Sequence, residues 1–186
     1  MKTAILLSIA IGFTVFNWTG CKNEDTPPVP TPTSGRATVN SRTVNNTVSG
    51  FSFSHAANIS FPNPSGVVPD IVVLVQTGPS GNIVGVFLAR PDTLLPAFRL
   101  LRAFGSIDSA SQYFQALREI PDTTYVDLAL PVTVGEIWAV WTRDNRFARI
   151  LIRNTTAYVD SSTGTRTLYG EATFDWAYQP DGTRRF

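Results

Sequence analysis

Few side chains in this 186-residue chain are of types that carry out chemistry, since it contains one histidine, His55, and one cysteine, Cys21. A Ser–His–Asp triad would have to use His55, and no Gly-x-Ser-x-Gly motif is present. Glu119, Glu136 and Glu171 are candidates for a glycosidase pair, but no pattern places two of them at one cleft. We therefore expect no enzyme, no metal site and no cofactor, and a structural, hydrogen-bonded role for His55.

The position of Cys21 indicates a different chemistry. Met1–Thr3 gives a short charged start, Ala4–Phe16 is apolar, and Thr19 and Gly20 stand directly before the cysteine. This arrangement is typical of a secretory signal, and the apolar stretch is shorter than the ~20 residues that a membrane-spanning helix requires. We predict a signal peptide over residues 1–20. With a single cysteine, an internal disulfide is excluded.

Thr19–Cys21 resembles the lipobox cut by lipoprotein signal peptidase, although Trp18 stands where that family usually has leucine. The resemblance implies that the Cys21 thiol is acylated and that the membrane is a partner through this lipid. Two or more acyl chains anchor a protein stably, since each buried CH₂ contributes ~0.8 kcal/mol. The alternative is an ordinary signal peptide in which Cys21 stands by chance.

Residues 21–36 form a predicted Pro-rich linker, because such a stretch favours extended polyproline II and acts as a semi-rigid spacer. Lys22 differs from the aspartate that retains many Gram-negative lipoproteins in the inner membrane, and Glu24–Asp25 resembles a surface-export tag. We expect a lipid anchor in the outer membrane, with the domain on its periplasmic or its cell-surface face.

Residues 37–186 are of a length that suits one domain with its own core. The whole chain has 15 basic and 14 acidic residues and a net charge of +1. This balance argues against nucleic acid as a partner.

Short β-rich runs bounded by turn residues predict an all-β, antiparallel β-sandwich with one short helix. The predicted strands are Thr38–Val48, Gly50–Ser54, Asp70–Val75, Ile83–Leu88, Tyr125–Leu130, Val134–Trp141, Phe147–Ile152 and Ala172–Tyr178. In the last run alternate residues are apolar, which is typical of a strand with one buried face. The apolar residues of Leu94–Phe104 fit neither the helical nor the strand periodicity.

Asp108 or Ser109 is the predicted N-cap at the start of the helix, because Ser109–Gln112 fits a capping box. Helical spacing of the apolar residues continues to Leu117, and Pro121 ends the helix soon after Ile120.

Trp141–Phe147 is the predicted tip of a hairpin, in which Asp144 and Asn145 tolerate positive φ. A loop of two or four residues pairs Val140 with Arg149 and Glu136 with Arg153. The predicted core face then contains Ile137, Ala139, Trp141, Ala148, Ile150 and Ile152. The opposite face presents a candidate ligand platform, formed by Trp138, Phe147, Arg149 and Leu151. The alternative is a sheet face half-covered by a loop, with Glu136 and Arg153 as a cross-strand pair.

Gly135–Ile152 also resembles a hairpin of Gram-negative surface lipoproteins that include the HmuY-like haem-binding family, with Asn145 in place of the usual glycine and Arg149 in place of lysine. That family holds haem iron with paired histidines or methionines, and this chain offers His55 alone. The resemblance therefore implies the fold and the export route. We expect a non-catalytic binding or scaffolding domain at the cell envelope, with a small molecule, a glycan or a protein as its ligand. The alternative is a surface module that captures a glycan or a flat hydrophobic ligand.

Overall fold

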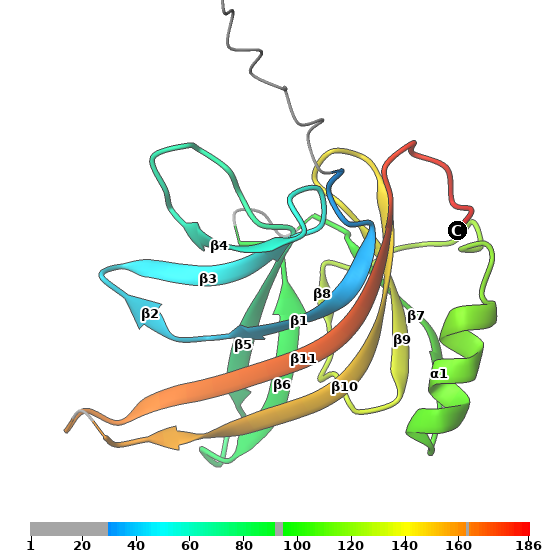
Figure 1. Ribbon diagram of the computed structural model, residues 1–186. Helices are drawn as coiled ribbons and strands as arrows, with labels where there is room; N and C mark the ends of the chain where they lie inside the picture. The colour runs from blue at the N-terminus through cyan, green and yellow to red at the C-terminus, as the bar shows by residue number, and fades with distance from the viewer. Residues whose placement is uncertain (1–29, 92–94, 163) are drawn as a thin grey trace, which may run out of the picture. The chain divides into compact units, whose positions relative to one another are not determined.

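The computed structural model describes residues 30–91, 95–162 and 164–186, and Thr31–Phe186 form one compact unit. Two antiparallel sheets face each other in a sandwich (Figure 1), which confirms the predicted all-β class with one short helix. The signal peptide, Cys21 and most of the linker lie outside the described residues. Strand β1 begins at Ser34, so the folded domain starts earlier than the predicted Ala37.

The first sheet joins the two ends of the domain, because the first strand pairs with the last. Its spatial order is β1 (Ser34–Asn40), β11 (Thr167–Gln179), β10 (Phe147–Asp160), β9 (Glu136–Trp141) and β7 (Phe98–Ala103). Strand β7 falls within the run that fitted neither period.

The second sheet is built from shorter strands. Its order is β2 (Thr43–Val44), β3 (Thr47–Ser52), β5 (Ile71–Thr77), β6 (Ile83–Ala89) and β8 (Leu128–Ala129), with β4 (Ala57–Phe61) also paired to β3. The predicted strand Thr38–Val48 is thus divided among β1, β2 and β3, and Tyr125–Leu130 forms only the short β8.

The core between the sheets is rich in aromatic side chains. On β11 the predicted alternation is confirmed, since Ala172, Phe174, Trp176 and Tyr178 are buried while Asp175 lies on the outer face. Phe51 of β3 contacts Phe174 and Trp176, with ring centroids 5.7 and 5.2 Å apart. This aromatic burial is a large part of the hydrophobic stabilisation.

Helix α1 (Ile107–Ala116) covers the outer face of the first sheet, beside β9 and β10 (Figure 1). Its N-cap is Ser106, so the predicted start at Asp108 or Ser109 is wrong. The earlier start lets Ile107 pack against a second apolar cluster, in which Ala110 of the helix meets Ile137 and Leu151 of the sheet. Burial of Ile107 thus favours an additional turn over the capping box.

The register of the β9–β10 hairpin differs from the prediction by one residue. Val140 pairs with Ala148 and Trp138 with Ile150. The reason is the turn: the Thr142 N–H donates to the Arg146 carbonyl, and Asn145 has φ 59°, so the loop contains the three residues Arg143–Asn145. An odd loop length reverses the side on which every β9 side chain lies relative to β10.

The predicted core face was therefore right for β10 and wrong for β9. Ala148, Ile150 and Ile152 of β10 do lie in the core, but their β9 partners are Trp138 and Val140. The β9 residues assigned to the core, Ile137, Ala139 and Trp141, lie on the outer face with Phe147, Arg149 and Leu151.

Asp70, which is 4% exposed, joins the second sheet to this hairpin turn. Its two carboxylate oxygens accept the backbone N–H groups of Phe53 and Arg143, each at 2.9 Å. Burial raises the pKa of Asp70, and the two N–H donors oppose that shift. A single carboxylate thus satisfies a donor from each sheet.

Asp175 joins three neighbouring strands on the outer face. It accepts hydrogen bonds of 2.6 Å from Arg36 of β1 and from Arg153 of β10. Arg153 also donates to Ser111 of α1. Burial alone would raise the pKa of Asp175, but the hydrogen bonds from both arginines outweigh it and hold the pKa below its ordinary value.

We expect Asp175→Asn to lower the free energy of unfolding by about 1 kcal/mol at pH 7, since exposed Arg36 is partly screened by solvent. A carboxyl whose pKa is lower in the folded state stabilises the fold above its unfolded pKa of ~3.9. That contribution is lost as the pH falls through the folded pKa. Urea unfolding of variant and wild type should therefore converge at low pH. Asp122→Asn, at an exposed ion pair with Arg184, is the control and should change little; a constant difference at all pH values would contradict the linkage.

Candidate functional site

The hairpin register separates the four residues predicted to form a ligand platform. Trp138 is 5% exposed and lies in the core, where its indole N–H donates to Glu136 at 2.9 Å. Phe147, Arg149 and Leu151 lie on the opposite face, and Leu151 is fully buried under α1. The predicted platform is therefore wrong as a unit, because its tryptophan points away from its other members.

The predicted Glu136–Arg153 pair does not form either. Glu136 accepts hydrogen bonds from the backbone and hydroxyl of Thr133, while Arg153 binds Asp175.

Trp141 takes the position on the outer face that was predicted for Trp138. It stacks on Phe147 across the hairpin, with ring centroids 6.5 Å apart and an interplanar angle of 15°. Tyr125 lies against both rings, at 6.0 Å from Trp141 and 6.5 Å from Phe147. We call these three residues the aromatic cluster. Trp141 is 40% exposed, which leaves much of its indole accessible to a ligand.

Polar and cationic groups border the aromatic cluster. The guanidinium of Arg184 lies over the Phe147 ring at 5.4 Å. A cavity of about 250 Å³ opens beside Trp141, and Arg90, Arg143 and Asn145 are among its lining residues. Burial raises the pKa of Tyr125, whose hydroxyl has no hydrogen-bond partner within the described chain. Such a surface suits ligands that combine a flat or apolar face with hydrogen-bonding groups.

The spacing of the two hairpin tryptophans in the sequence already bears on which residues reach this surface. Trp138 and Trp141 are three positions apart in one strand, so they must point to opposite faces. The sequence therefore implied that one of the two lies on the outer face, but the loop length decides which one.

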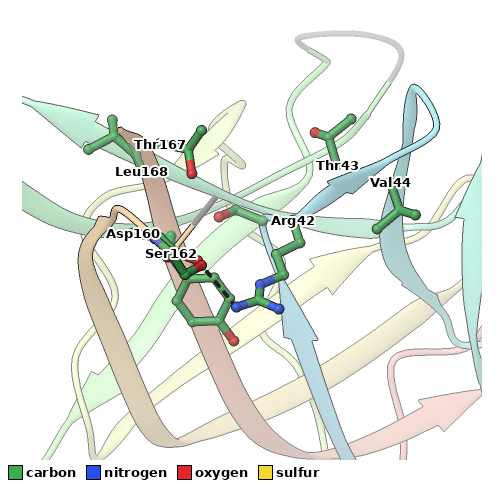
Figure 2. Close-up of a pocket in the computed structure, with 9 residues that line it drawn as sticks. Arg42, Thr43, Val44, Asp160, Ser162, Thr167 and Leu168 are labelled. Atoms are coloured by element: carbon green, nitrogen blue, oxygen red, sulfur yellow. Dashed lines mark hydrogen bonds and ion pairs between the residues drawn. The ribbon is translucent and has the colours of Figure 1, made fainter. Parts of the chain in front are cut away.

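A cavity of about 390 Å³ lies elsewhere, between the turn after β1 and the end of the β10–β11 ribbon. Figure 2 shows Arg42 and Asp160 joined there by an ion pair, which measures 3.2 Å. Arg42 also lies over the ring of Tyr169, at 5.1 Å. The Tyr169 hydroxyl donates to Glu171, and this hydrogen bond, aided by burial, raises its pKa to about 12. Since these charges are paired within the protein, the cavity has little electrostatic attraction for a ligand.

The groups that sequence analysis considered for catalysis are dispersed. His55 is exposed, and its Nδ1 lies 3.1 and 3.2 Å from the hydroxyls of Ser52 and Ser54. Glu119 pairs with Arg185, while Glu136 and Glu171 have the separate partners given above. In residues 30–186, apart from the undescribed 92–94 and 163, no group of three or more histidine and acidic side chains is placed to hold a metal ion.

Comparison of the chain with protein-family models, with curated proteins and with solved structures found no match. Within the described part of the chain, no helix has the length and apolar character needed to cross a bilayer. The site must therefore be interpreted from its own geometry.

The observed register predicts different losses of folding stability when each of the two hairpin tryptophans is replaced by alanine. Trp138→Ala removes a buried side chain and should lower the free energy of unfolding by about 3–5 kcal/mol. Trp141→Ala removes a partly exposed ring and should cost about 1 kcal/mol through lost aromatic contacts. Urea unfolding followed by circular dichroism measures both. Equal losses, or a larger loss at Trp141, would mean that the register is the one predicted from the sequence.

Proposed function

We propose that this protein is a lipoprotein anchored in the outer membrane through Cys21, and that its β-sandwich is a non-catalytic binding or scaffolding domain of the cell envelope. The observation that carries this proposal is Thr19–Cys21, which resembles a lipobox and follows the apolar stretch Ala4–Phe16. A lipid on Cys21 would retain the domain at the membrane, and the Pro-rich linker would act as a spacer.

The folded unit is consistent with a binding role. The histidine and the acidic side chains described above are engaged in separate structural contacts, and the accessible features of the domain include aromatic and cationic surfaces. Such surfaces suit ligands that combine an apolar face with polar groups.

Metabolic labelling with a clickable fatty acid tests the anchor. The wild-type chain should incorporate the label and partition into the membrane fraction, whereas Cys21→Ser should do neither, because its hydroxyl is not a substrate for thioether formation. Lys22→Ala is the matched control and should remain labelled. Equal labelling of wild type and Cys21→Ser, or no labelling of either, would contradict the proposal.

The second candidate function is capture of a glycan or a flat hydrophobic ligand at the cell surface. The observation that favours it is the aromatic cluster, in which exposed Trp141 is held against Phe147 beside a cavity. A sugar ring or an aromatic molecule would stack on the indole, and the bordering arginines would donate hydrogen bonds.

A binding screen with glycans and flat aromatic compounds tests this function. We expect a ligand that shifts the tryptophan fluorescence of the wild type, and at least tenfold weaker binding to Trp141→Ala. Tyr158→Ala is the control, since Tyr158 is a similarly exposed aromatic (42%) at the far end of β10. Unchanged affinity in Trp141→Ala would place the ligand elsewhere and contradict this function.

A further inference from the structure

Arg149 is a buried cation that has no acidic partner among the described residues. The residue is 7% exposed, and its guanidinium lies between the rings of Phe114 and Phe186, at 4.8 and 4.7 Å. One of its N–H groups donates to the carbonyl of Leu117. Among the described residues no acidic group forms an ion pair with it, and its Nε has no hydrogen-bond partner.

The surroundings of Arg149 further destabilise its positive charge. Burial, followed by repulsion from Arg118, lowers its pKa to about 10. A guanidinium nevertheless stays protonated at neutral pH, so the charge persists although most of the side chain is buried. An unpaired buried charge is costly and is usually paired with an opposite one.

The strand register places a small side chain, that of Ala177, beside Arg149. Ser34 of β1, Ala177 of β11 and Arg149 of β10 lie directly opposite one another, so all three side chains share the outer face. The row continues through Ala139 to Arg99 and contains no acidic residue. Because Ala177 is small, it leaves a hollow between Ser34 and Arg149.

This hollow is a pocket of about 270 Å³. Arg149 lines it together with the polar residues Thr33, Ser34 and Gln179 and the ring of Phe186. It therefore combines a cation with two hydroxyl groups and with the Gln179 amide, which donates one of its two N–H groups to the Arg185 carbonyl and keeps the other for a ligand.

We propose that this pocket is a binding site for an oxyanion, the carboxylate or phosphate group of a small ligand, with Arg149 as its anchor. A guanidinium donates two parallel hydrogen bonds to such a group, and Thr33, Ser34 and Gln179 satisfy its remaining oxygen atoms. The site borders the aromatic cluster, since Gln179 pairs with Phe147, but it contains none of the three cluster residues and does not depend on the lipid anchor. It is a second place at which this domain recognises a ligand.

Thermal unfolding of the full chain in increasing inorganic phosphate or acetate, with sodium chloride holding the ionic strength constant, tests this proposal. At saturation we expect the melting temperature to rise by about 3 °C or more with at least one of the two anions. A response to phosphate alone or to acetate alone identifies the preferred group. A response no larger than that to chloride would overturn the proposal.

Two variants make the test specific. Arg149→Met keeps the apolar stem without the charge, so it should abolish the anion response while leaving the ligand-free protein at least as stable as the wild type. Arg153→Met is the matched control on the same strand and should keep the response, because Arg153 is paired with Asp175. Should Arg149→Met fail to fold, Arg149→Lys replaces it and must show a weakened response. An equal response in the wild type and in the Arg149 variant that folds would also overturn the proposal.

Discussion

The carboxylate of Asp70 joins the second sheet to the β9–β10 turn, and the first sheet depends on the geometry of that turn. One Asp70 oxygen accepts a donor from the end of β3, and the other accepts the N–H of Arg143 in the hairpin turn. The turn is thereby held in the conformation in which Asn145 has positive φ, and this conformation fixes the β9–β10 register. That register decides which β9 side chains enter the core, which lie under α1, and which tryptophan belongs to the aromatic cluster.

The sequence predicted those parts of the fold in which one periodicity dominates. Strand β11 alternates apolar and polar residues, so its buried face was identified correctly. Strand β9 has apolar residues on both faces, because Ile137 is covered by α1 and Trp138 by the second sheet. Its pattern could not distinguish the two faces, and only the turn geometry did. Helix α1 began earlier than predicted for a related reason, since tertiary burial of Ile107 outweighs a local capping motif.

Asp175 and Arg149 are neighbours on the outer face of the first sheet, but their charges have different environments. Asp175 has two arginine partners that lower its pKa, so its charge contributes to stability. Arg149 has aromatic rings and one carbonyl, so its charge lowers stability unless something else pairs with it. Proteins tolerate such a cost where function requires it, and surplus stability elsewhere, here from the aromatic core, offsets it. Neither environment was visible in the sequence, since each depends on residues from distant strands and from the C-terminal segment.

The pairing of β1 with β11 has a consequence for how the domain forms. Ser34–Asn40 find their partners only in residues 171–177, so the first sheet cannot be completed before nearly the whole chain is present. Closing so long a loop is slow, and β1 remains without its strand partner in the meantime. Under the proposed export, with the N-terminus crossing the membrane first, β1 would emerge long before its strand partner. The first sheet would therefore close only after β11 had followed.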